Sequence, residues 1–352
     1  MKNIKILGDG FLTTIQDKGR IGYQKYGMPV AGAMDDFAFR IANLLVGNQE
    51  NEAAMEITLV GPSIQFNIET IIAITGANLD PYINEKLLPM WRSIKIHQGD
   101  VLSFKGLRSG CRGYIAIACG MQIESVMGSK STYLRGCVGG FEGRKLKSGD
   151  EIDLNVDDAD LNYLCNKKVS YKHIPVYENV NEIRVVLGPQ DECFAEGVIK
   201  LFFESEYKVT NESDRMGYRL DGPKLENLNG ADIISDGIAL GSIQVPGDGM
   251  PIIMMADRQT TGGYTKIATI ISSDLMAIAQ MKPGDIIRFS PVTVVEAQEL
   301  FRRYEAMIKL IKDDISNNRI EVIDTKQFRM NFNSKSGDQI FEVLAEEIKN
   351  DK

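Results

Sequence analysis

The first half of the chain alternates apolar and polar residues in short runs, and glycine-rich turns separate these runs. Runs of this kind cover residues 56–60, 64–68, 71–74, 94–96, 101–104 and 114–118. A Gly-Asp pair that leads into an alternating run recurs at residues 99–100, 149–150 and 284–285. Short strands with turns at intervals of about 8–12 residues are typical of a β-barrel or a β-sandwich. The pattern predicts a mainly β protein whose related β units share equivalent corners.

Apolar residues follow a helical spacing at only a few places. The expected helices cover about residues 36–46, 191–202, 273–281 and 293–315. Asp35 or Asp36 can cap the first of them, and Asp191 can cap the second. Thr293 and Glu296 have the spacing of a capping box, which predicts the start of a long, charged amphipathic helix. The fold is therefore expected to be mainly β with some α structure.

The end of the chain alternates again at residues 328–332 and 340–345, which predicts a hairpin around residues 333–339. A C-terminal helix from Gln339 is the alternative. The polar, charge-mixed stretch at residues 155–177 is interpreted as the crossing between two domains. The resulting division is a first β-barrel unit at residues 1–165, a second at residues 166–292, and a C-terminal helix and hairpin tail at residues 293–352.

The overall charge of the chain argues against two classes of binding partner. The formal net charge is −8 and the isoelectric point is about 5.1, which argues against nucleic acid or an anionic membrane surface as a partner. No apolar run approaches the roughly 18 residues that a membrane-spanning helix needs, and the first apolar run is too short for a secretory signal. We therefore expect a cytoplasmic protein.

Cysteine and histidine usage predicts neither disulfides nor a metal site. The five cysteines are scattered and none forms a Cys-x-x-Cys pair, so reduced thiols are expected. The two histidines, His97 and His173, lie in a turn and in a polar connector. A histidine-based metal site or catalytic triad has little support in this pattern.

A short buried strand is expected at residues 252–255, and the polar residues after it are candidates for chemistry. A carboxylate, a guanidinium, an amide and hydroxyls follow on what is predicted to be one loop, from Asp257, Arg258, Gln259, Thr260, Thr261 and Tyr264. Gly262 and Gly263 lack a Cβ and therefore let a ligand or another strand approach the backbone closely. The alternative is a polar hairpin end whose side chains only satisfy backbone groups.

A pair of arginines forms a second candidate. Arg215 and Arg219 stand four residues apart with Gly217 between them. Such a pair can clamp a carboxylate or a phosphate through bidentate hydrogen bonds. A solvated pair in a hairpin explains the spacing equally well.

Several segments then occur in a characteristic order, at residues 16–20, 32–35, 129–150, 213–217, 243–246, 259–264 and 283–285. Together they resemble the biotin-dependent carboxyltransferase family. This family includes the C subunit of 5-oxoprolinase, part of the carboxyltransferase module of allophanate hydrolase and urea carboxylase, and the KipA antagonist protein. The resemblance covers about residues 12–290. It implies two tandem cyclophilin-like β-barrels, in agreement with the strand pattern.

The resemblance also implies an activity and partners. The expected activity is that of an ATP-dependent amide hydrolase of the 5-oxoprolinase type, which opens the lactam of 5-oxoproline to glutamate. A protein like the B subunit or KipI is expected to complete the active site, and a lactam-hydrolase-like A subunit is a further candidate partner. ATP, with Mg²⁺, is the implied cofactor, although the chain has no Gly-x-x-x-x-Gly-Lys loop. Biotin is not expected on this chain because no Met-Lys-Met acceptor occurs in it.

On this interpretation the catalytic candidates are Arg215, Asp257, Gln259 and Tyr264. The candidates for binding substrate or nucleotide are Gln16, Asp17, Arg20, Arg219, Gln244, Pro246, Arg258, Thr260, Thr261, Gly262 and Gly263. Two alternatives stay open: carboxyl transfer to urea or a related amide, and a KipA-like regulatory subunit that binds a kinase inhibitor without chemistry.

Overall fold

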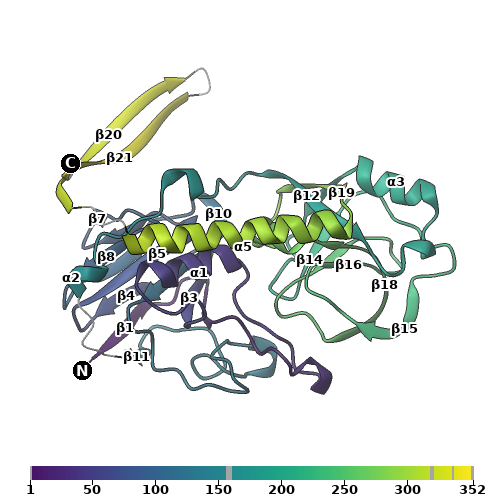
Figure 1. Cartoon of the computed structure of the whole chain (residues 1–352), viewed down its shortest axis with the longest axis horizontal. Helices are drawn as coiled ribbons and strands as arrows, with labels where there is room; N and C mark the ends of the chain where they lie inside the picture. Colours follow the sequence, from purple (N-terminus) through teal and green to yellow (C-terminus); the bar gives the residue numbers. More distant parts are fainter. Residues whose placement is uncertain (1, 156–160, 318–320, 335–336, 350–352) are drawn as a thin grey trace.

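Two β lobes lie side by side in the computed structural model, and one long helix runs across both of them (Figure 1). The structure describes residues 2–155, 161–317, 321–334 and 337–349. The chain builds the first lobe, crosses to the second, and then returns through the long helix α5 (Val294–Asn317) to the first. None of the helices in these residues is long and apolar enough to cross a membrane.

The first lobe consists of two sheets packed around one core. One sheet has the order β11-β1-β4-β9-β6-β7 and the other the order β2-β3-β10-β5-β8. The strands are β1 (Asn3–Gly8), β2 (Leu12–Gln16), β3 (Ala54–Thr58), β4 (Ser63–Phe66), β5 (Thr70–Asn78), β6 (Pro81–Ile83), β7 (Lys86–Leu87), β8 (Ser93–Ile96), β9 (Val101–Phe104), β10 (Ser109–Ile117) and β11 (Glu151–Asp153). Alternate residues such as Ile4, Phe66, Ile57 and Ile115 fill the space between the sheets.

Helix α1 (Asp36–Leu45) covers the outer face of the second of these sheets. It begins where the sequence predicts, because the Asp35 side chain accepts a hydrogen bond from Ala38 N at 2.9 Å. Its apolar face packs with Tyr114 and Trp91 in a second core of the first lobe. Burial of nearly the whole helix fixes the position of its N-terminus, which faces the second lobe.

The second lobe contains a closed barrel of seven strands. The strands follow the order β12-β19-β13-β14-β17-β16-β18, and a β12–β18 pairing closes the ring. Their bounds are β12 (Val180–Leu187), β13 (Glu206–Val209), β14 (Gly217–Asp221), β16 (Ser242–Val245), β17 (Ile252–Met254), β18 (Thr261–Ile270) and β19 (Ile286–Pro291), and β15 (Asp232–Gly237) extends the sheet beyond β18. Closure leaves β15 as the edge strand and confirms the expectation of a barrel.

Short helices complete the described chain. They are α2 (Leu161–Leu164), α3 (Glu196–Glu204), α4 (Leu275–Ala279), η1 (Gln24–Tyr26), η2 (Leu134–Gly136), η3 (Tyr171–His173), η4 (Asp191–Cys193) and η5 (Ser272–Asp274). The second predicted helix starts later than expected: Asp191 belongs to the 3-10 turn η4 and does not cap α3. Phe202 of α3 stacks on Phe289 with ring centroids 4.6 Å apart, which anchors α3 to the barrel.

The three Gly-Asp turns are equivalent corners, as the sequence predicts. Gly99, Gly149 and Gly284 have φ values of 92°, 94° and 98°, which favour glycine. In each turn the aspartate that follows accepts a hydrogen bond from the backbone N–H three residues earlier, at 2.8, 2.7 and 3.0 Å. The same local chemistry therefore starts strands β9, β11 and β19 in both lobes.

Helix α5 packs on the first lobe along much of its length. The capping box is confirmed, because Glu296 Oε2 accepts from Thr293 N at 2.8 Å and Thr293 Oγ1 accepts from Glu296 N at 3.2 Å. Further along, Arg40 of α1 pairs with Glu305 at 2.6 Å. The helix is thus part of the body of the protein, and only the hairpin after it projects away (Figure 1).

The hairpin confirms one of the two alternatives for the C-terminal segment. It consists of the antiparallel strands β20 (Glu321–Ser334) and β21 (Gly337–Lys349). Both strands are longer than the alternating runs at residues 328–332 and 340–345. The helix from Gln339 that the sequence also allowed does not form.

The packing of α5 gives a first prediction. Ile308 is 1% exposed against α1, whereas Leu310 on the same helix is 47% exposed. Ile308→Ala should lower the free energy of unfolding by about 2–5 kcal/mol, because it leaves a cavity in a packed core. Leu310→Ala, the matched control, should change it by no more than about 0.5 kcal/mol. Urea unfolding of both variants measures the difference, and equal effects would show that α5 is not packed as described.

Candidate functional site

Arg215 lies between the two lobes at the centre of a buried charge network. It precedes β14, and only 4% of it is exposed. Its Nε and Nη2 donate to the two carboxylate oxygens of Asp257 at 3.1 and 2.9 Å, and its Nη1 donates to Glu56 Oε1 on β3. Burial alone lowers the pKa of Arg215, but Asp257 and Glu56 outweigh burial and raise it. The guanidinium therefore stays charged and joins the lobes.

Glu56 carries this network into the first lobe. Its Oε2 accepts hydrogen bonds from Met34 N and from the Tyr114 hydroxyl, both at 2.8 Å. The Tyr114 oxygen in turn accepts from Asp35 N at 2.8 Å, directly before α1. Each buried oxygen thus has a donor, which is the condition under which buried charge is tolerated.

Gln280 makes a second link between the lobes. It follows α4, and its Oε1 accepts from the N–H groups of Cys111 and Arg112, both at 3.0 Å, where the register of β10 against β5 shifts. Its Nε2 donates to Arg112 O at 2.8 Å and to Asp35 Oδ2 at 2.7 Å. Burial raises the pKa of Asp35 to about 6, although the bond from Gln280 opposes this rise. The Gln280 side chain of the second lobe thus takes backbone hydrogen bonds of β10 at the point where its pairing with β5 is irregular.

These contacts change the interpretation of two predicted catalytic residues. The exposed fractions of Arg215 and Asp257 are 4% and 6%, and their charges compensate each other. The predicted clamp of Arg215 with Arg219 does not form, because Arg219 is exposed and lies 3.5 Å from Glu212 instead. Arg215 and Asp257 therefore hold the lobes together, and neither is free to bind a substrate in this arrangement.

Gln16, Asp17 and Arg20 have a similar role within the first lobe. All three are buried and fasten the loop at residues 126–132. The Asp17 carboxylate accepts several hydrogen bonds, among them one from Ser129 Oγ at 2.6 Å. The sequence predicts that these residues bind a ligand, whereas their hydrogen bonds in the structure hold this loop in place.

A cleft of about 230 Å³ brings together four of the predicted residues, and we call it the amide cleft. It lies on the outer face of the second-lobe barrel, because side chains alternate along β14, β16 and β17: Ile243 and Ile253 fill the barrel, and Gln244 points outward. Its lining residues are Arg135, Glu212, Asp214, Met216, Gly217, Arg219, Gln244, Ile252, Met254, Gln259 and Tyr264. The predicted residues among them are Arg219, Gln244, Gln259 and Tyr264.

Two side-chain amides in this cleft each have one buried atom without a hydrogen-bond partner. Gln244 is 2% exposed, and its Nε2 is buried without a hydrogen-bond acceptor. The Oε1 of Gln259 is buried without a donor. A buried polar group without a partner costs about 1–3 kcal/mol, so such groups in a native structure call for an explanation. One unmatched donor and one unmatched acceptor in the same cleft suit a ligand that offers both functions.

The polar residues 257–264 do not form a single loop, which corrects the sequence-based interpretation. β17 ends at Met254 and β18 begins at Thr261, so Thr261, Gly262, Gly263 and Tyr264 belong to a strand. Strand alternation therefore separates their side chains. Neither Thr261 nor the neighbouring Thr260 lines the amide cleft, and nor does Pro246.

The two glycines differ in what they make room for. Neither has a positive φ. A Cβ on Gly262 would lie 2.7 Å from Gln244 Nε2 and 2.6 Å from Ile238 Cδ1, whereas a Cβ on Gly263 would come no closer than 3.3 Å to Ile233 O. Gly262, more than Gly263, provides the space in which the Gln244 amide lies.

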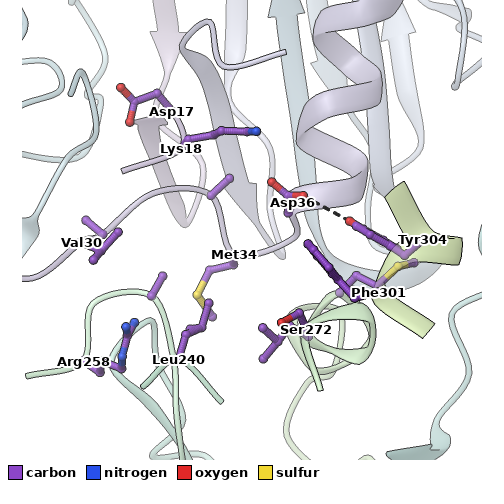
Figure 2. A pocket seen from close by; sticks show the side chains of 15 residues that line it. Asp17, Lys18, Val30, Met34, Asp36, Leu240, Arg258, Ser272, Phe301 and Tyr304 are labelled. Carbon is purple, nitrogen blue, oxygen red and sulfur yellow. Dashed lines mark hydrogen bonds between the residues drawn. The ribbon is translucent and has the colours of Figure 1, made fainter. Parts of the chain in front are cut away.

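A second pocket, of about 250 Å³, lies where the first lobe, the second lobe and α5 meet (Figure 2). We call it the junction pocket. It is lined by Asp17, Lys18, Val30, Ala31, Ala33, Met34, Asp36, Leu240, Ala256, Arg258, Ser272, Leu275, Met276, Phe301 and Tyr304. Of the predicted site residues it contains only Asp17 and Arg258, and most of the predicted set lines neither pocket.

Two important residues are absent from the sequence-based set. Arg135 of η2 enters the amide cleft from the first lobe, and the glycine- and arginine-rich passage around it is a signal for such a role. Glu56 stands in β3, in which every residue is buried. A charge in such a strand indicates a buried partner, but Arg215 is 159 residues away in the sequence, so local pattern does not identify it.

Comparison with known proteins now places the chain in a family. Residues 26–291 match the family described as "Carboxyltransferase domain, subdomain A and B". The chain is 36% identical to the C subunit of 5-oxoprolinase from Haemophilus influenzae over 310 residues, which is 88% of this chain and 97% of the relative. It is also 36% identical to the corresponding protein of Escherichia coli over 84% of this chain and 93% of the relative. The chain therefore belongs to the carboxyltransferase-domain family.

Solved structures agree with this placement. The crystal structure of the Kluyveromyces lactis urea amidolyase superposes with a TM-score of 0.83 at 32% identity, over 88% of this chain and 20% of that protein. The urea amidolyase of Saccharomyces cerevisiae is 35% identical over 87% of this chain, which corresponds to 17% of the relative. The chain thus spans about one fifth of the urea amidolyases that it matches.

The charge network leads to a second prediction. Arg215→Met should lower the free energy of unfolding by about 3–5 kcal/mol, because it leaves Glu56 and Asp257 buried without a counter-charge. Arg219→Met, an exposed arginine four residues later, should cost no more than about 1 kcal/mol. Chemical unfolding of the isolated chain measures both. An unchanged free energy of unfolding for Arg215→Met would return Arg215 to the list of catalytic candidates.

The two glycines lead to a third prediction. Gly262→Ala should displace the Gln244 amide, because the new Cβ would approach Nε2 closer than real Cβ atoms do. Gly263→Ala should leave it in place. Side-chain amide signals in ¹⁵N–¹H spectra report this directly: the Gln244 signals should move only in the first variant. Equal shifts in both variants would contradict the assigned role of Gly262.

Proposed function

We propose that this chain is the C subunit of an ATP-dependent 5-oxoprolinase and that the amide cleft binds the lactam substrate. The observation that supports this most directly is the unmatched pair in the cleft, Gln244 Nε2 and Gln259 Oε1. A lactam ring has one carbonyl acceptor and one N–H donor on the same edge. The carbonyl accepts from Gln244, and the ring N–H donates to Gln259, so each buried group gains its missing partner.

The rim of the cleft suits the rest of the substrate. 5-Oxoproline carries a carboxylate next to the ring nitrogen, and Arg135 and Arg219 line the same cleft from the two lobes. Guanidinium groups bind carboxylates through paired hydrogen bonds. Glu212 and Asp214 at the rim lower the local positive charge, so the site favours a single carboxylate over a polyanion.

The proposed reaction needs ATP because an unactivated lactam is a poor electrophile. Transfer of the γ-phosphoryl group to the lactam oxygen releases ADP and activates that carbon for attack by a first water, after which the C–N bond breaks and leaves an acyl phosphate. A second water then releases phosphate and completes the formation of glutamate. The residues that would hold ATP and Mg²⁺ are proposed to lie mainly on a partner protein. Within the cleft, this chain's residues orient the ring for that reaction.

A multi-subunit assembly is part of the proposal. The two bacterial 5-oxoprolinase relatives match this chain over almost their full length, and their name denotes one of several subunits. We propose a partner like the B subunit that completes the cleft and a partner like the A subunit for the hydrolytic step. A cytoplasmic location is proposed with it, supported by five cysteines that are all free thiols.

Carboxyl transfer to urea is the second candidate, because urea amidolyases share this fold. Urea also offers an amide edge to Gln244 and Gln259. It has no carboxylate, however, and would offer no anionic group to Arg135 and Arg219.

The proposal makes a fourth prediction, in which activity and stability respond differently. Gln244→Met and Gln259→Met should each reduce 5-oxoproline turnover by the complex on the order of tenfold, because each removes one hydrogen bond to the ring. Neither should lower the melting temperature, because each removes a buried polar atom that has no partner in the protein. Gln98→Met, an exposed glutamine in a turn, is the matched control and should change neither quantity.

The measurement is ATP-dependent release of glutamate by the chain reconstituted with its A-like and B-like partners, with thermal melting of each variant. Full activity in both glutamine variants would remove the amide cleft from the mechanism. Turnover by the isolated chain would refute the part assigned to the partners. Consumption of urea and not of 5-oxoproline would favour the second candidate.

A further inference from the structure

The junction pocket has no part in the proposed function. It opens among loops of both lobes and the first turns of α5 (Figure 2). No residue lines both pockets. Its volume of about 250 Å³ is slightly below the roughly 300–1,000 Å³ of sites for drug-sized ligands. A compact molecule fits such a space.

The strongest feature of the pocket is a buried cation. Arg258 is 6% exposed, and its hydrogen bonds are to backbone carbonyls: Nε donates to Ile238 O at 3.0 Å and Nη1 to Met255 O at 3.3 Å. No carboxylate of the described residues forms an ion pair with it. Burial alone lowers the pKa of Arg258 to about 10. A charge that is removed from water without a counter-charge is costly unless an anion neutralises it.

The two carboxylates that line the pocket do not neutralise Arg258. Asp17 is occupied by Gly19 N and by the donors of the loop at residues 126–132, at distances that include 2.7 and 2.6 Å. Asp36 pairs with Arg40 at 3.1 Å and accepts from the Tyr304 hydroxyl at 3.3 Å. The exposed amine of Lys18 adds positive charge on the first-lobe side (Figure 2). The pocket can therefore accept a ligand group with one negative charge.

The rest of the lining is largely apolar. Met34 and Leu240 lie close to each other in Figure 2, and Phe301 of α5 also lines the pocket. Leu240 and Phe301 are 38% and 43% exposed, which is high for large apolar side chains. A ligand that covers them gains free energy from the apolar area removed from water. The pocket thus combines one buried cation with an exposed apolar wall.

We propose that the junction pocket binds a small monocarboxylate with a compact, branched or aromatic apolar group. The carboxylate pairs with the guanidinium of Arg258, and the apolar group packs against Leu240, Leu275 and Phe301. Because the lining comes from the first lobe, the second lobe and α5, the bound molecule links all three. Ligand binding stabilises the docked arrangement of the lobes and so raises the melting temperature of the whole chain.

The experiment titrates the intact chain with isocaproate, which has both a carboxylate and a branched apolar group. Isocaproamide supplies the same apolar group without charge, and acetate supplies the charge without the apolar group. Isocaproate should raise the melting temperature in a saturable way, and the other two should not at equal concentration. Arg258→Gln should weaken isocaproate binding at least about tenfold, because it removes a charge-assisted hydrogen bond.

Two further variants keep the test decisive if Arg258→Gln folds poorly. Ser272→Trp changes an exposed residue of the pocket lining and fills the space, so it should abolish the isocaproate shift while leaving the melt without ligand nearly unchanged. Arg288→Gln, an exposed arginine on β19 paired with Glu206, should retain the full shift. The proposal is overturned if isocaproate gives no saturable shift, or if the shift survives in Ser272→Trp.

Discussion

The arrangement of the two lobes depends on the burial of one arginine between two carboxylates. Removing an arginine and its partners from water costs several kcal/mol per ion, and only complete hydrogen bonding in good geometry recovers that cost. The partners of Arg215 are Glu56 on β3 and Asp257 after β17, on different lobes. Neither lobe alone can satisfy the guanidinium. The network therefore forms only in one docked geometry, and a misplaced lobe leaves charges buried and unpaired.

This constraint also fixes the segment that serves both pockets. Asp257 is held by Arg215, and the next two residues point to different places: Arg258 lines the junction pocket and Gln259 lines the amide cleft. Three glutamines near the two lobes differ in whether all their buried amide atoms have hydrogen-bond partners. Gln280 has partners for both its amide nitrogen and its oxygen, so it is structural. Gln244 and Gln259 each retain a buried atom without a hydrogen-bond partner, and the proposed function assigns these atoms to the ligand.

Local chemistry made much of the fold predictable from the sequence. The Gly-Asp corners, the Asp35 cap and the Thr293–Glu296 box act through neighbours within a few residues, so their patterns identify them. The site was only partly predictable. The structure brings the predicted residues Gln244 and Gln259 into the amide cleft, whereas Arg215 and Asp257, predicted to be catalytic, pair with each other. Residue type does not reveal whether the partner of a charge is a substrate or another lobe, and Arg135 reaches the cleft through tertiary packing alone.

Under the proposed function, the choice between a lactam and urea rests on the rim of the cleft and not on its amide pair. Both molecules offer a carbonyl and an N–H, so Gln244 and Gln259 cannot distinguish them. Arg135 and Arg219 can, because urea would desolvate them without supplying a carboxylate. Arg135 belongs to the first lobe and Arg219 to the second, so the distance between these cations is set by lobe docking. The buried network around Arg215 thereby influences which substrate binds, because it fixes how the lobes dock. Arg215 does not itself line the amide cleft.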